Sequence, residues 1–272
     1  MDKKIHSIID KLNPKLRSVD EYNGQKRVRE FYAMSAEDAY SIFESIADIL
    51  YTRKEMNRIR DLVKKYDLFL FSDEVYREFI YTGSPYISAC HLEGIEQNVV
   101  LIDSVSKRYS ECGIRIGALI TKNKQLRDAV MKFCQARLSP PLLGQIVAEA
   151  SLDCPRSYAI HTYEEYIERR NCLIDGLNKI DGVYSPIPMG AFYTVVRLPI
   201  DDSDRFCEWC LNDFEYEGAT VMLAPASGFY SESDLGRDEV RIAYVLDKND
   251  LKRALTILSK ALEAYPGRTI NK

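Results

Sequence analysis

Three short runs of apolar residues, each followed by polar side chains, constrain the fold of this chain more than any other feature. They cover residues 68–71, 98–103 and 116–120. Before the first run, the capping box Thr52-Arg-Lys-Glu55 predicts the start of a helix. Continuous apolar runs joined through helices are typical of parallel strands that are covered on both faces. The sequence therefore predicts an α/β layer with a mostly parallel sheet.

The rest of the chain shows other patterns. Residues 1–50 have helical periodicity, interrupted by a turn signal at Asn23-Gly24. Residues 123–180 also have a helical pattern, with a break at Ser139-Pro140-Pro141. Short strands and helices then alternate, which is typical of an α+β arrangement. The expected strands and helices of this last part are residues 192–198, 203–214, 240–245 and 248–264.

These patterns predict three parts of the chain. We expect a helical segment at 1–50, an α/β domain at 51–150 and a smaller C-terminal α+β domain at 151–272.

Charge and cysteine content exclude several classes of protein. The 37 Lys and Arg residues against 41 Asp and Glu residues give a net charge of −4, which offers no basic footprint for nucleic acid or an anionic membrane. No apolar run approaches the ~20 residues that span a bilayer. The seven cysteines are scattered, and the Cys207-Glu-Trp-Cys210 pair has no second Cys or His pair after it. We therefore expect a cytoplasmic protein with reduced thiols and no metal site.

Polar residues after the apolar runs carry the candidate chemistry. The first run is followed by Asp73 and Tyr76, the second by Ser104 and Lys107, and Arg115 precedes the third. The carboxyl ends of strands in open α/β sheets form the ligand crevice. A lysine after a strand is, by itself, most often a solvated strand end. In this combination, the amine can bind an aldehyde, the carboxylate a protonated ring nitrogen and the guanidinium a phosphate, which pyridoxal phosphate requires.

The segment Ser104-Val-Ser-Lys107-Arg-Tyr-Ser110-Glu-Cys-Gly113-Ile-Arg115-Ile-Gly117 resembles the signature of the class I/II aminotransferases, which are pyridoxal phosphate enzymes of fold type I. It is most similar to the aspartate aminotransferase branch. The resemblance implies that Lys107 is the catalytic residue and carries the cofactor, and that Ser104 and Arg115 bind the phosphate. It also implies that Asp73 binds the pyridine nitrogen and Tyr76 the phenolate oxygen. Glu111 departs from the pattern, since that position is usually apolar.

The resemblance extends over roughly residues 51–268. It includes Arg137-Leu-Ser-Pro-Pro141 and Met189-Gly-Ala-Phe-Tyr193. It also includes Glu239-Val-Arg241-Ile-Ala-Tyr244, in which it implies that Arg241 binds the substrate α-carboxylate. A planar guanidinium suits a carboxylate bidentately. The alternative for Arg241 is a surface ion pair at a strand edge.

The segments that begin the large domain in this family have no counterpart in residues 1–43, and Glu44-Ser-Ile-Ala-Asp-Ile-Leu50 stands in place of the family's Asn-Pro loop. The resemblance therefore implies a truncated large domain with an incomplete sheet. Open sheet edges invite association. We expect a homo-oligomer, such as a dimer, or association with a full-length subunit.

The leading functional hypothesis is an aminotransferase that moves an amino group between an aspartate-like amino acid and a 2-oxo acid. The alternative is a non-catalytic aminotransferase remnant that acts as a scaffold or partner subunit. A pyridoxal-binding transcription regulator would need a basic head, whereas residues 1–50 hold 8 Lys and Arg residues and 9 Asp and Glu residues.

Overall fold

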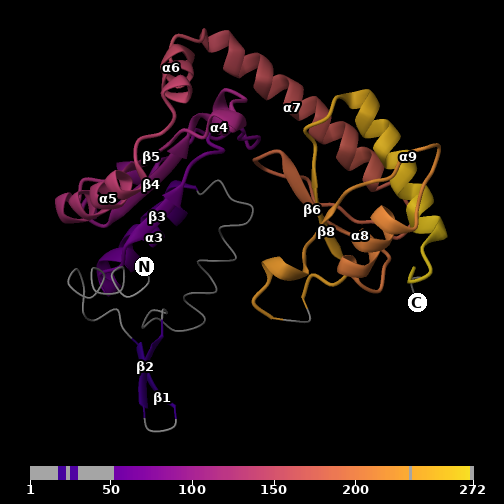
Figure 1. The fold of residues 1–272 in the computed structure, drawn as a ribbon, viewed down its shortest axis with the longest axis horizontal. Coiled ribbons are helices and arrows are strands. Elements are labelled where there is room, and N and C mark those ends of the chain that lie inside the picture. Colours follow the sequence, from indigo (N-terminus) through magenta and orange to yellow (C-terminus); the bar gives the residue numbers. More distant parts are fainter. Residues whose placement is uncertain (1–17, 23–24, 30–51, 233–234, 270–272) are drawn as a thin grey trace. The chain divides into compact units, whose positions relative to one another are not determined.

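The structure is a computed structural model, and it describes residues 18–22, 25–29, 52–232 and 235–269. The described residues form two compact units (Figure 1). Unit 1 contains the described residues up to Arg77 together with Ser84–Cys154. Unit 2 contains Glu78–Gly83 and the described residues from Pro155 onward.

The first described elements form a hairpin. Strands β1 (Ser18–Tyr22) and β2 (Gln25–Arg29) pair antiparallel, with Tyr22 opposite Gln25. The prediction of helical structure throughout residues 1–50 is therefore wrong for these two segments. Two strands separated by Asn23-Gly24 match the strongest short-range hairpin signal, which we interpreted only as a turn between helices. The rest of the helical segment expected at 1–50 lies outside the described residues.

Helix α3 (Arg53–Tyr66) begins at the predicted capping box. Thr52 accepts a hydrogen bond from the Glu55 backbone N–H at 3.3 Å, and the Glu55 carboxylate accepts one from the Thr52 backbone N–H at 2.7 Å. The buried side chains of Met56 and Val63 pack into one apolar cluster with Val99 of the neighbouring sheet. The predicted start of this helix is thus confirmed, and its buried face packs on the sheet.

The sheet of unit 1 has the order β3 (Leu70–Asp73), β4 (Val99–Ser104), β5 (Gly117–Ile120). Strands β3 and β4 are parallel, as predicted, but β5 runs antiparallel to β4. The connection from β4 to β5 contains the one-turn helix α4 (Val105–Arg108) and the 3₁₀ turn η3 (Cys112–Ile114). This connection is too short for the helical crossover that joins two parallel strands.

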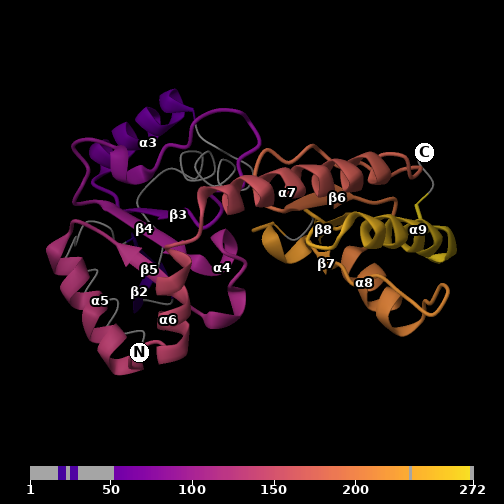
Figure 2. The ribbon, with the colours of Figure 1, turned by 90° about the horizontal axis from the view of Figure 1, so that it is seen from above.

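Coverage of this sheet also differs from the prediction. In Figure 2, α3 lies on one side of the sheet and α5 (Lys124–Arg137) on the other. Every residue of β5 is nevertheless exposed, so the expectation of strands buried on both faces is wrong there. Pro140 and Pro141 separate α5 from α6 (Leu142–Ser151), as the break signal predicted. Between β3 and β4, the 3₁₀ turn η2 (Ala89–His91) contributes Ala89 to the core under α3.

Unit 2 is built on an antiparallel sheet with the order β6 (Tyr193–Arg197), β8 (Glu239–Ala243), β7 (Ala224–Pro225). The other elements are α7 (Arg156–Leu177), α8 (Ser203–Asn212), η4 (Ser227–Phe229) and α9 (Lys248–Ala264). The strands and helices expected from residue 192 onward are confirmed to within two residues at each end. Strand β7 was not predicted, because two residues are too short to show a period.

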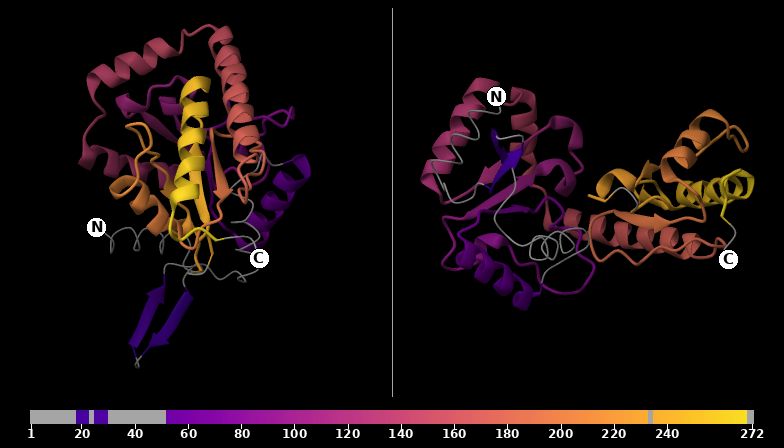
Figure 3. Two further views of the ribbon diagram at one scale, coloured as in Figure 1. Left: turned by 90° about the vertical axis from the view of Figure 1, so that its right-hand side faces the viewer. Right: turned by 90° about the horizontal axis from the view of Figure 1, so that it is seen from below.

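The core of unit 2 lies where its helices pack on this sheet. Leu177 of α7, Phe206 of α8, Leu262 of α9 and Val240 of β8 are fully buried in one cluster. Helices α7 and α9 lie side by side, and the yellow α9 can be followed along α7 in Figure 3. No helix in the described ranges combines the length and apolarity needed to cross a bilayer.

Candidate functional site

The candidate site lies at one edge of the unit 1 sheet. Because β3 and β4 are parallel and Asp73 pairs with Ile102, the last residues of both strands, Asp73 and Ser104, lie at the same edge. Strand β5 runs the opposite way and starts at this edge, where Gly117 pairs with Ser104. The backbone thereby brings the segments that carry Asp73, Lys107 and Arg115 to the same edge of the sheet.

Lys107 and Tyr76 lie close together at this edge. Lys107 is in the short helix α4, which Ser104 caps by accepting a hydrogen bond from the Ser106 backbone N–H at 3.1 Å. The Lys107 Nζ atom lies 5.9 Å from the centre of the Tyr76 ring, within the range of a cation–π contact. The structure therefore places the predicted lysine beside the predicted phenol.

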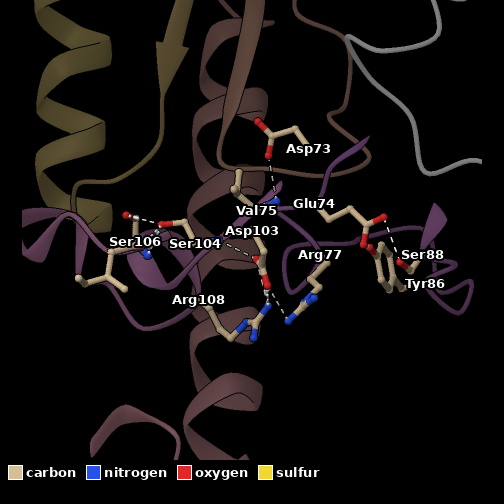
Figure 4. Close-up of polar contacts among 11 residues, drawn as sticks. Asp73, Glu74, Val75, Arg77, Tyr86, Ser88, Asp103, Ser104, Ser106 and Arg108 are labelled. Carbon is tan, nitrogen blue, oxygen red and sulfur yellow. Dashed lines mark hydrogen bonds and ion pairs between the residues drawn. The ribbon is translucent and has the colours of Figure 1, made fainter. Parts of the chain in front are cut away.

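The side chains of Asp73 and Arg115 each form a hydrogen bond with the backbone two or three residues away. The Asp73 carboxylate accepts a hydrogen bond from the Val75 backbone N–H at 3.2 Å, and its residue is exposed (Figure 4). Arg115 donates to the Cys112 carbonyl at 2.9 Å, which uses one of its five N–H donors. Its φ of 60° is in the left-handed region, where a non-glycine residue costs roughly 1–2 kcal/mol. Strain of this kind is concentrated at functional sites.

Ser104 has a structural role in addition to its predicted one. Its Oγ lies 2.8 Å from both the Ser106 Oγ and the Ile116 carbonyl, and the carbonyl can only accept. The hydroxyl proton of Ser104 is therefore used within the protein, where it ties α4 to the segment that enters β5. A phosphate contact by this hydroxyl would require it to turn away from Ile116.

Two acidic residues to which sequence reasoning assigned no role organise this edge. Glu74 is buried and accepts hydrogen bonds from Ser72 Oγ at 3.0 Å, Ser88 Oγ at 3.1 Å, the Ala89 backbone N–H at 2.9 Å and the Tyr86 hydroxyl (Figure 4). This network fixes the chain directly after Asp73. The only signal in the sequence was the carboxylate itself, adjacent to the motif residue.

The second of these acids is Asp103, which precedes Ser104. Its carboxylate forms ion pairs with Arg77 and Arg108, the residues that follow Tyr76 and Lys107. No local pattern marks this bridge, because Arg77 is distant from Asp103 in the sequence and the five-residue spacing to Arg108 follows no helix or strand period.

Arg241 belongs to unit 2 and is described within that unit alone. It is exposed on β8, where it pairs with Val195 of β6. Its guanidinium carbon lies 5.5 Å from the centre of the Tyr193 ring and 5.0 Å from that of Phe229. Both aromatic rings are within the range of a cation–π contact with this guanidinium. A guanidinium in this position is a group that suits bidentate binding of a carboxylate.

The Met189–Tyr193 segment of unit 2 contains a residue with unusual backbone geometry. Ala191 has a φ of 59°, and its carbonyl accepts hydrogen bonds from the Tyr81 hydroxyl at 2.6 Å and the Tyr244 hydroxyl at 3.1 Å. Burial raises the pKa of both phenols, so they are protonated donors at neutral pH. Two donors on one carbonyl hold this loop in its strained conformation.

Cys207 and Cys210 are free thiols buried on α8. Burial raises the pKa of Cys207 to about 11 and that of Cys210 to about 12, which disfavours the thiolate that a metal or redox site needs. Among the residues that the structure describes, no group of His, Cys, Asp and Glu side chains is arranged to hold a metal ion.

A family model described as aminotransferase class I and II matches residues 49–258, which is most of the chain. The chain belongs to this family. The predicted resemblance is therefore confirmed, and the lysine signature lies within the matched range. Members of the family typically use pyridoxal phosphate.

Individual relatives agree with this assignment. The aspartate aminotransferase of Rhizobium meliloti is 27% identical over 215 residues, covering 74% of this chain and 50% of the relative. The aromatic-amino-acid aminotransferase 2 of Thermococcus litoralis is 28% identical over 216 residues, covering 78% and 53%. The crystal structure of the aspartate aminotransferase from Thermotoga maritima superposes with a TM-score of 0.67 at 27% identity, covering 80% of this chain and 54% of that chain. The chain thus spans about half the length of the relatives it matches.

Proposed function

We propose that this chain performs, or contributes to, pyridoxal phosphate-dependent transfer of an amino group between an aspartate-like amino acid and a 2-oxo acid. The observation that carries the proposal is the position of Lys107. It follows a central strand, lies 5.9 Å from the Tyr76 ring and shares a sheet edge with Asp73. Family membership supports the class of reaction. The amino-acid preference rests on relatives that include both aspartate and aromatic aminotransferases.

The residues at the edge fit the cofactor by their chemistry. They comprise an amine, a carboxylate, a phenol, a hydroxyl and a guanidinium, which are the groups needed for covalent attachment, the ring nitrogen, the phenolate oxygen and the phosphate. They are Lys107, Asp73, Tyr76, Ser104 and Arg115. Pyridoxal phosphate, when bound, supplies the aldehyde and a ring that accepts electrons.

Each of these residues has a definite role in the proposal. Lys107 would hold the cofactor covalently and, once the substrate displaces its amine, would move the proton that leaves the substrate Cα. Asp73 keeps the ring nitrogen protonated, and Arg115 neutralises phosphate charge. Arg241 binds the substrate carboxylate. We further propose that residues 51–150 are the partial cofactor-binding domain and residues 151–272 the small domain.

Addition of pyridoxal phosphate to the purified chain tests this function. We expect an absorbance change from covalent attachment that Lys107→Ala abolishes and that Lys132→Ala, on the exposed surface of α5, leaves unchanged. Attachment that survives in Lys107→Ala would refute the assignment.

The second candidate function is a non-catalytic partner subunit, and the exposed apolar side chains of unit 1 favour it. Exposed apolar side chains are typical of association sites where they form a contiguous patch. Sedimentation velocity, alone and with a full-length aminotransferase subunit, would test whether the chain associates. The most exposed of these side chains are Phe71, Leu138, Leu142, Leu143, Ile146 and Leu152.

A further inference from the structure

One carboxylate connects the two turns that carry Tyr76 and Lys107. Asp103 Oδ2 lies 2.9 Å from Arg77 Nη2 and 2.9 Å from Arg108 Nη2, so two guanidinium groups share one oxygen (Figure 4). Arg77 directly follows Tyr76, and Arg108 directly follows Lys107. The Asp103 bridge therefore spans the same two segments as the contact between the Tyr76 ring and the Lys107 Nζ atom.

The carboxylate is itself held in place. Its Oδ1 accepts a hydrogen bond from the Ser104 backbone N–H at 2.9 Å and a longer one from Arg108 at 3.3 Å. The side chain of Asp103 is 14% exposed, and those of Arg77 and Arg108 are 26% and 19% exposed. Ion pairs that are partly removed from water are screened less by salt than surface pairs.

Removal of the Asp103 carboxylate would replace attraction by repulsion between the turn that carries Arg77 and the turn that carries Arg108. Without Asp103, two positive guanidinium groups that both approach the same oxygen would face each other and repel. Each is attached to the chain one residue after a candidate site residue. Their separation would pull Tyr76 away from Lys107.

We propose that Asp103 is a positioning residue, which holds Tyr76 against Lys107 by bridging Arg77 and Arg108. The functional consequence is preorganisation of Lys107 for covalent attachment of pyridoxal phosphate, and this part rests on the proposed function. Its geometric part, the dependence of the contact between Tyr76 and Lys107 on Asp103, applies to the chain without any ligand.

The experiment measures this contact in the ligand-free chain. Reductive ¹³C-methylation places an NMR probe on Lys107, and Lys107→Arg identifies its resonance. The difference from Tyr76→Leu gives the shift caused by the Tyr76 ring. Asp103→Asn keeps the shape of the side chain but removes its charge, and Arg77→Ala breaks the bridge from its other end. The control Asp128→Ala removes an exposed ion pair with Arg127 on α5.

We expect the ring-dependent shift to be lost in Asp103→Asn and Arg77→Ala and retained in Asp128→Ala. In a parallel titration, Asp103→Asn should weaken attachment of pyridoxal phosphate roughly tenfold, because the lysine is then no longer held in position. A shift that persists in both variants, even with a lower unfolding temperature, would show that the bridge is only structural and would overturn the proposal.

The two proposals can fail separately. If the native chain does not attach pyridoxal phosphate, the proposed function fails, while the shift in the ligand-free chain still decides the role of Asp103. If attachment occurs and is equally strong in Asp103→Asn, the proposed consequence of the bridge is refuted and the function stands.

Discussion

Replacement of the buried Glu74 by alanine should destabilise unit 1 severely. Glu74 is 6% exposed, and its carboxylate accepts hydrogen bonds from four donors, of which Ser88 Oγ and the Ala89 backbone N–H are themselves buried. The other two, from Ser72 and Tyr86, are partly exposed and can turn to water. A buried donor left unpaired costs about 1–3 kcal/mol, so two of them cost about 2–6 kcal/mol.

Amide hydrogen exchange in β4 is the appropriate measurement. The only tryptophan, Trp209, lies in unit 2 and does not report on unit 1. A loss of about 4 kcal/mol would accelerate exchange of the β4 amides by about three decades, since 1.4 kcal/mol corresponds to a factor of ten. Glu74→Gln keeps an acceptor oxygen and should cost only about 1 kcal/mol.

The control is Glu93→Ala, an exposed carboxylate on the same connection between β3 and β4, which should change stability by less than about 0.5 kcal/mol. Exchange of the β4 amides in Glu74→Ala within about tenfold of the native rate would refute the reasoning, because the two buried donors would then have found other partners.

Two further predictions concern unit 2. Burial raises the thiol pKa of Cys207 to about 11 and that of Cys210 to about 12, so the folded state keeps thiol protons that the unfolded state loses above the free-thiol value of 9.0. The resulting stability is fully present below pH 9.0 and is lost as the pH rises from 9.0 through 11 and 12. The urea midpoint followed by Trp209 fluorescence should fall over that interval, and an equally large fall in the double variant Cys207→Ala/Cys210→Ala would contradict this. Ala191→Gly should raise the melting temperature, because relief of left-handed strain of about 1–2 kcal/mol exceeds the entropic cost of glycine, about 0.4–1 kcal/mol. Ala226→Gly, at a φ of −93°, should lower the melting temperature, and a fall for Ala191→Gly as well would refute the strain argument.

Signals that act over a few residues were reliable guides to this fold. The capping box at Thr52 marks the start of α3, and the Pro140-Pro141 pair separates α5 from α6. The periodicity of residues 248–264 coincides with α9. The motif from Ser104 to Gly117 indicated the family that the comparison confirms, because the positions in such a motif are set by one strand end and the turn after it.

Contacts between distant segments were not accessible in this way. An apolar run looks the same whether its strand runs parallel or antiparallel to its neighbour, so the direction of β5 was predicted wrongly. The hairpin at Asn23-Gly24 was not predicted, because the flanking residues do not alternate strictly between apolar and polar. The bonds to Glu74 from Tyr86, Ser88 and Ala89 span 12 to 15 residues and follow no period.

The sequence by itself therefore determined the positions of most helices and strands, the family and the identity of the candidate site residues. Only the tertiary structure decided that Lys107 lies beside Tyr76 and that Asp103 bridges Arg77 and Arg108. It also decided that the Ser104 hydroxyl donates a hydrogen bond to the Ile116 carbonyl. The physical reason is the range of the interactions. Caps and periodicity depend on neighbours within one or two turns, whereas an ion pair or a strand pairing depends on where the whole chain has brought its partners.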